Sequence, residues 1–310
     1  MTGAGLRARL ARAVGVLAVL GCLLPGMGSA GERIRVFVSI LPQKFFAESV
    51  GGDRVDVSVM VGPGQSPATY APRPAQLAAL AEARLYFAVG VPFEQAWMRR
   101  IRAAAPDLVV VETQQGIRLR PMDVPPGMER SEPRQGGRRD PHVWLSPALV
   151  AHQARRMAQG LTREDPRGAA VYRERLRRFE ERLKALDRDL RAILAPVRGA
   201  RFLVFHPSWG YFADAYGLRQ VPVEVDGKPP RARTLARLAS WARKERVGVL
   251  VVGPRLRRGT VEMLARAFRA RVVVADPVAE DWEGELRRFA ANLAAALQDA
   301  GSAEGRAPSR

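Results

Sequence analysis

The chain has 310 residues, of which 47% are hydrophobic. It can therefore bury a sizeable core, in one large domain or in two domains of ordinary size. This hydrophobic content excludes a disordered chain. Its net charge is +19, almost all from arginine. The arginines alternate with glutamate in segments such as YRERLRRFEERLKALDRDLRAIL, which argues against nucleic-acid binding and indicates a solvated surface; attraction to an anionic membrane or wall remains the alternative.

The first thirty residues are typical of a secretory signal. Arginines without any acid precede an apolar run at 13–24, and small residues follow as far as Ala30. The run is too short to span a bilayer stably. We expect a signal peptide over 1–30, cleavage after Ala30 and a periplasmic location. Cys22, the only cysteine, also fits a lipobox, so a lipid anchor at Cys22 is the alternative.

Strands and helices alternate in the first half of the remaining chain. Apolar and β-branched runs predict strands, and amphipathic segments that end at glycine or proline predict helices. Strands are expected at 34–40, 55–64 (ending in a turn), 84–90 and 107–113, with helices at 45–52, 73–83 and 93–105. A Pro- and Gly-rich stretch at 114–139 is predicted to be a long exposed loop.

Two long helices and a second alternating half follow. Pro147 opens a helix to about Leu161, and Asp165 is expected to cap one that runs to about Leu194, about 40 Å at 1.5 Å per residue. Strands are then expected at 201–206, 219–225, 247–253 and 271–278, with helices at 210–217, 232–245, 259–269 and 282–298.

This order predicts an α/β protein with two Rossmann-like lobes, whose mostly parallel sheets are joined by one long rigid helix. The expected organisation is a signal peptide at 1–30, an N-terminal lobe at 31–146, linker helices at 147–196, a C-terminal lobe at 197–300 and a disordered tail at 301–310.

Three candidate metal ligands lie where predicted strands or loops end. His206 and Asp276 each end an apolar strand, and His142 lies between a loop and a helix. Ligands bind beyond the carboxyl ends of strands in open α/β sheets, and two imidazoles with a carboxylate suit Zn²⁺. A hydrogen-bonded structural histidine is the alternative for each. His152, in mid-helix, is interpreted as a surface residue, and Asp140 as a partner of His142 or a helix cap.

The motifs SILPQKFFAESVGG, VGPGQSPATYAPRPAQLAALAEARLYFAVGVPFE, DPHVWLSP, HPSWGYFADAYGL and ADPVAED occur in this order. With them the chain resembles the zinc- and manganese-binding receptors of bacterial ABC importers. The resemblance implies a metal site between two lobes, with ligands at His142, His206 and Asp276. Histidine at the second of these positions resembles the zinc receptors more than the manganese receptors.

The resemblance also implies a fourth ligand that is missing. The family's first loop typically reads Ser-Pro-His, whereas this chain has Ser66, Pro67 and Ala68. Three explanations are open: water completes the site, Glu224 replaces the lost histidine, or the site takes a metal chelate or no metal. The alternative for Glu224 is a surface carboxylate or one that forms a salt bridge with neighbouring arginines.

We therefore expect a monomeric extracytoplasmic receptor, not an enzyme, that captures a divalent metal, Zn²⁺ before Mn²⁺, and delivers it to an ABC-transporter permease. Peripheral membrane association is compatible with this, and nucleic acid is not an expected partner. The alternatives are an adhesin or chelate receptor with a degenerate site, and a zinc hydrolase using Glu224 or Asp281 as base. The hydrolase lacks a His-Glu-x-x-His pair.

Overall fold

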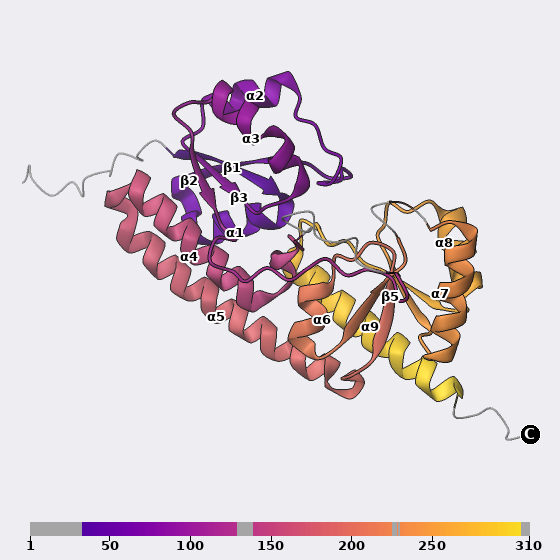
Figure 1. Cartoon of the computed structure of the whole chain (residues 1–310). Helices are drawn as coiled ribbons and strands as arrows, with labels where there is room; N and C mark the ends of the chain where they lie inside the picture. The colour runs from indigo at the N-terminus through magenta and orange to yellow at the C-terminus, as the bar shows by residue number, and fades with distance from the viewer. Residues whose placement is uncertain (1–32, 129–138, 225–227, 229, 305–310) are drawn as a thin grey trace, which may run out of the picture. The chain divides into compact units, whose positions relative to one another are not determined.

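The computed structural model describes residues 33–128, 139–224, 228 and 230–304, and the described residues from Ile34 onward fall in one compact unit (Figure 1). The predicted signal peptide, its cleavage site after Ala30 and the lipobox cysteine Cys22 lie outside these residues. In the described part of the chain, no helix is long and apolar enough to cross a membrane.

The first sheet contains four parallel strands in the order β2-β1-β3-β4. The central strand β3 is buried at every residue, which explains its unbroken apolar sequence. Helices α1, α2 and α3 connect the strands. The bounds are β1 Ile34–Ile40, α1 Leu41–Gly51, β2 Val55–Val61, α2 Pro74–Ala81, β3 Leu85–Ala88, α3 Pro92–Ala104 and β4 Val109–Glu112.

The second sheet repeats this topology, again with four parallel strands, in the order β6-β5-β7-β8. Two α/β lobes with parallel sheets were predicted, and this prediction is confirmed. The bounds are β5 Arg201–Val204, α6 Gly210–Tyr216, β6 Arg219–Pro222, α7 Ala232–Lys244, β7 Val249–Val252, α8 Arg258–Phe268, β8 Arg271–Val274 and α9 Trp282–Glu304.

The closing helix α9 differs from the sequence prediction at its end. It was expected to stop at Gln298, with a disordered tail over 301–310, but it continues to Glu304. Gly301 is the only helix-breaking residue type in this extension, and a single glycine costs a helix only about 1 kcal/mol. Residues 305–310 lie outside the described part of the chain.

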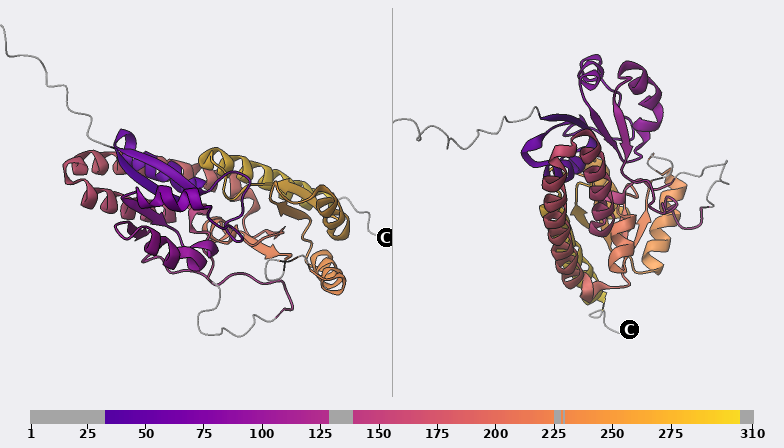
Figure 2. Two further views of the ribbon diagram at one scale, coloured as in Figure 1. Left: turned by 90° about the horizontal axis from the view of Figure 1, so that it is seen from above. Right: turned by 90° about the vertical axis from the view of Figure 1, so that its left-hand side faces the viewer.

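Two long helices lie side by side in space (Figure 2). In the sequence they come after the first sheet and before the second. They are α4, Pro147–Glu164, and α5, Ala169–Leu194, and α5 also packs against α1 and α9. The Asp165 side chain accepts a hydrogen bond from the Gly168 backbone N–H at 3.1 Å, so it caps the short 3₁₀ turn that leads into α5. The predicted long helix is therefore present.

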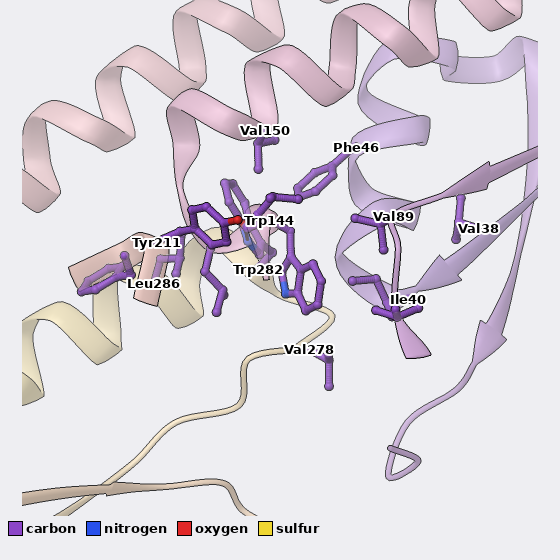
Figure 3. Packing of buried hydrophobic residues seen from close by; sticks show 14 of the residues in the cluster. Val38, Ile40, Phe46, Val89, Trp144, Val150, Tyr211, Val278, Trp282 and Leu286 are labelled. Atoms are coloured by element: carbon purple, nitrogen blue, oxygen red, sulfur yellow. Dashed lines mark hydrogen bonds between the residues drawn. The ribbon is translucent and has the colours of Figure 1, made fainter. Parts of the chain in front are cut away.

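Two hydrophobic cores form within the compact unit. The larger one joins the first sheet to α1, α4, α5 and α9 and reaches β5 and β7 of the second sheet. Figure 3 shows part of it, where Phe46 of α1 meets Trp282 of α9 edge to face, with ring centroids 4.9 Å apart. The smaller core lies between the second sheet and helices α7 and α8, and it includes Leu250, Leu238 and Phe268.

A buried carboxylate, Glu94, organises the N-terminus of α3. Its Oε2 accepts the Gly90 backbone N–H at 2.7 Å, and its Oε1 accepts the Val89 N–H at 2.9 Å and the Ser39 hydroxyl. Gly90 has a φ of 86°, a left-handed conformation that glycine adopts at little cost. Burial raises the pKa of Glu94 to about 7, despite hydrogen bonds that oppose the change. These hydrogen bonds give the residue a structural role at the start of α3.

We expect Glu94 to make folding stability depend on pH. Because its folded pKa of about 7 exceeds the unfolded value of 4.5, the folded state binds the extra proton between these values. The free energy of unfolding should therefore fall as the pH rises from about 5 to 8, by at most about 3 kcal/mol from this group. Denaturant unfolding across this range measures the change. Glu94→Gln, which cannot titrate, should remove this component, and an unchanged slope in the variant would contradict the assignment.

Candidate metal centre

His142 is fixed by the acidic residue two positions before it. The Asp140 Oδ1 atom accepts the His142 backbone N–H at 3.0 Å and lies 2.7 Å from the ring Nδ1. Asp140 is fully buried, and burial lowers the pKa of His142. If the ring is neutral with its proton on Nδ1, the Nδ1–H donates a hydrogen bond to this carboxylate, and Nε2 is left with a free lone pair for a metal.

His206 has the same kind of partner. It follows β5, and its Nδ1 lies 2.7 Å from Oε1 of Glu224, which follows the neighbouring strand β6. The backbone continues the pairing, because the Glu224 N–H donates to the Phe205 carbonyl at 3.1 Å. Glu224 is 9% exposed, so the alternative of an ordinary surface carboxylate does not describe it.

The two imidazoles lie next to each other. Their ring centroids are 5.2 Å apart with an interplanar angle of 72°. Each ring has a buried carboxylate at its Nδ1 side. A pair of imidazoles that is oriented in this way matches the donor chemistry of Zn²⁺ sites.

Asp276 is held near this region without joining the two rings. The indole N–H of Trp144, two residues after His142, donates to the Pro277 carbonyl at 2.6 Å. The Asp276 Oδ1 atom accepts the Val278 N–H at 3.0 Å, and Oδ2 lies 4.0 Å from an Arg255 guanidinium nitrogen. Among the described residues, no three His, Cys, Asp or Glu side chains are grouped closely enough to hold a metal ion.

The loop that contains Ala68 is anchored by its neighbours. Ala68 is exposed, and its backbone N–H donates to the Ser66 hydroxyl at 3.3 Å. Tyr70 is buried against Phe93, with ring centroids 5.2 Å apart, and the Pro67 carbonyl accepts the Phe93 N–H at 3.3 Å. The loop can therefore present a side chain at position 68 without disturbing the core.

The sequence did not predict a network of hydrogen bonds and an ion pair that connects Asp140 to neighbouring residues. The Tyr211 hydroxyl of α6 donates to the Asp140 carbonyl at 3.0 Å and accepts the Arg120 backbone N–H at 3.0 Å. Arg120 lies 3.1 Å from Asp123, which accepts the Gln220 amide at 2.9 Å. Arg120 and Asp123 were assigned to an exposed loop at 114–139, but both are only 20% exposed. Their packing onto α6 and β6 is a long-range contact, which local composition does not reveal.

The remaining candidates pack elsewhere. His152 is half-buried, and its Nε2 lies 2.8 Å from the Gln115 carbonyl. Trp209, three residues after His206, is 2% exposed and packs on Phe289 with a centroid distance of 3.8 Å, so it is part of the core. Asp281 pairs with Arg288 at 2.9 Å, and this hydrogen bond lowers the pKa of Asp281.

Residues 36–299 match the family model described as "Zinc-uptake complex component A periplasmic". The chain belongs to this family. The family consists of solute-binding receptors of metal transport and not of enzymes, as expected from the sequence. Family members are periplasmic receptors or extracytoplasmic lipoproteins.

Individual relatives agree with this membership. The chain is 25% identical over 236 residues to the high-affinity zinc uptake system protein ZnuA of Bacillus subtilis, covering 72% of this chain and 71% of the relative. A crystal structure of a ZnuA superposes with a TM-score of 0.78 at 37% identity, covering 86% of this chain and all of that one. The laminin-binding protein Lmb of Streptococcus agalactiae, described as an adhesin with metal-transporting activity, shares the fold at 21% identity, a TM-score of 0.74 and coverage of 86% and 100%.

Proposed function

We propose that the protein is an extracytoplasmic receptor that captures a divalent metal, most readily Zn²⁺, between its two lobes and delivers it to an ABC-transporter permease. The observation that carries this proposal is the adjacent pair His142 and His206, each with its Nδ1 against a buried carboxylate. The family membership supports the transport role.

The donor atoms favour zinc over manganese. Imidazole nitrogen suits Zn²⁺, whereas Mn²⁺ is better served by carboxylate, carbonyl and water oxygens. Asp276 supplies the third ligand in this proposal. To do so it must move toward the two rings and exchange its contact with Arg255 for the metal, which requires a rearrangement of the segment after β8 within the second lobe. Water or Glu224 completes the coordination.

The signal sequence places the mature chain in the periplasm in this proposal, and the receptor acts as a monomer. A lipid anchor at Cys22 would keep it at the outer face of the cytoplasmic membrane instead. Adhesion is a weaker candidate, because its support comes from one structural neighbour that shares only the fold, at 21% identity.

Calorimetric titration of the metal-stripped chain from residue 31 onward tests this function. We expect one tight site for Zn²⁺ and weaker binding of Mn²⁺. Binding should be weaker below the ordinary imidazole pKa of about 6.5, because the ligands must be neutral. No heat of binding with either ion would overturn the proposal and favour a chelate receptor or adhesin.

Glu224 allows a sharper prediction about its own role. Because its Oε1 already contacts the His206 ring, we expect it to orient that ring, although a direct ligand role is the competing hypothesis. Glu224→Gln keeps an oxygen acceptor and should weaken zinc binding less than about tenfold. Glu224→Ala should weaken it about 10–100-fold, the usual cost of losing such a partner.

The comparison of the two Glu224 variants by zinc titration distinguishes the roles. A large and equal loss in both would show that the carboxylate itself coordinates the metal, since glutamine is a poor zinc ligand. Thermal unfolding of each variant without metal controls for loss of the fold.

A further inference from the structure

The positive charge of the chain is concentrated on one part of the second lobe. Between Arg231 and Arg271 the sequence has twelve arginine or lysine residues and two acidic residues, so this segment carries +10 of the total +19. All twelve basic residues are exposed. They are Arg231, Arg233, Arg237, Arg243, Lys244, Arg246, Arg255, Arg257, Arg258, Arg266, Arg269 and Arg271.

Most of these basic residues form no ion pair in the part of the chain that the structure describes. Within the described residues, ion pairs are formed by Arg258 with Glu262, by Arg271 with Asp299, and by Arg255 with Asp276 at 4.0 Å. The second acid of the segment, Glu245, pairs with Arg201 outside it. The other nine basic residues form no ion pair with any described residue.

The long helix α5 shows that this arrangement is not general. It carries eight basic and five acidic residues, and several form ion pairs along the helix. Arg177 pairs with Glu174 and Glu181, and Arg191 pairs with Asp187. The excess of basic over acidic residues on α7 and α8 therefore cannot be explained by the arginine-rich composition of the chain alone.

The outer sides of α7 and α8 form one surface, which we name the basic face. The two helices pack against each other, and Figures 1 and 2 show them on the same side of the second sheet. Leu238 and Ala242 of α7 and Leu264 and Phe268 of α8 point into the smaller core. Arg233 and Arg237 are one helical turn apart on the opposite, exposed side of α7.

We propose that the basic face docks the receptor on an anionic phospholipid surface. The charges are spread along two helices, which suits a broad layer of phosphate groups better than a single acidic peptide. Arginine also binds phosphate through two parallel N–H donors. Each basic residue near such a surface strengthens binding about fivefold at moderate salt, and the attraction falls off within a Debye length of about 8 Å at physiological ionic strength.

Vesicle sedimentation tests this proposal. The chain from residue 31 onward contains the whole compact unit and lacks the apolar segment that could itself enter a bilayer. We expect it to sediment with vesicles that contain phosphatidylglycerol, to remain in solution with pure phosphatidylcholine vesicles, and to dissociate as salt is raised. Changing Arg233, Arg237 and Arg266 together to glutamine should weaken binding roughly a hundredfold.

A matched variant on α5 provides the control. Arg173, Lys184 and Arg188 are also exposed and form no ion pair with a described residue, so their change to glutamine removes the same charge. This variant should bind vesicles nearly as the unchanged chain does. If both variants lost vesicle binding equally, binding would depend only on the net charge of the protein, and this would overturn the proposal.

Two further outcomes would also overturn it. Binding to neutral vesicles would indicate an apolar contact. If the protein does not bind anionic vesicles but is retained on immobilised polyglutamate, the basic face binds an acidic protein partner instead. Unchanged zinc titration of both variants would show that the basic face and the metal centre are separate.

Discussion

Replacing His206 with alanine is expected to abolish tight zinc binding. The ring is one of two adjacent imidazoles in the candidate centre, and in the proposed function its Nε2 bonds the metal directly. The loss should exceed the roughly 10–100-fold cost of removing a residue that only orients a ligand. It would also leave the Glu224 carboxylate without its ring partner. Calorimetric titration with Zn²⁺ measures the loss.

His152 offers the matched control, because it is a histidine of the same chain that contacts the Gln115 carbonyl and is not placed in the centre. His152→Ala should bind zinc as the unchanged chain does. If His206→Ala kept full affinity while His152→Ala lost it, the proposed centre would be wrong. Thermal unfolding without metal shows whether either variant loses stability, and only the His206 change should remove the stabilisation that added zinc provides.

Introducing histidine at position 68 is expected to raise zinc affinity. The resemblance to metal receptors implies a histidine ligand at this position, and the exposed Ala68 leaves space for a larger side chain. A complete structural zinc site is worth about 10–16 kcal/mol, so one added imidazole can contribute on the order of 3 kcal/mol, or about a hundredfold. Competition titration against a chelator of known zinc affinity measures so large a gain.

Thr69→His is the control for this gain, since Thr69 is the exposed neighbour of Ala68 in the same loop. A nonspecific effect of an added histidine would appear in both variants. A gain confined to Ala68→His would show that the loop still reaches the metal and that the native site lacks one protein ligand. Unchanged or reduced affinity would mean that another group, such as Glu224, already fills the fourth position.

The sequence predicted the fold well because its signals are local. Apolar runs such as 34–40 and 249–252 are long enough to mark buried parallel strands, and the spacing of Leu183, Leu186 and Leu190 marks a continuous helix face. The predicted end of α9 was wrong because a helix can continue through small and polar residues when no proline interrupts them. The exposure expected for Arg120 and Asp123 was wrong because their partners, Tyr211 and Gln220, are distant in sequence.

The candidate site was predictable only in part. Strand ends indicated His206, and the DPHVWLSP motif indicated His142, while the hydrogen bond suggested between Asp140 and His142 is present. The bond between Glu224 and His206 was not foreseen, because it depends on the pairing of β5 with β6. Whether Asp276 and Glu224 coordinate metal stays a prediction, since coordination depends on movements that neither spacing nor a single conformation specifies.

The separation of the hydrophobic residues into two cores has a consequence for how the native state fluctuates. The smaller core involves α7, α8 and one face of the second sheet, and the larger core does not depend on those two helices. The two helices can therefore loosen in a sub-global opening while the rest of the chain stays folded. Repulsion among those arginines of the two helices that form no ion pair with a described residue favours that opening, and any bound polyanion would oppose it. The charged surface and the cooperativity of the second lobe are thus coupled through the same pair of helices.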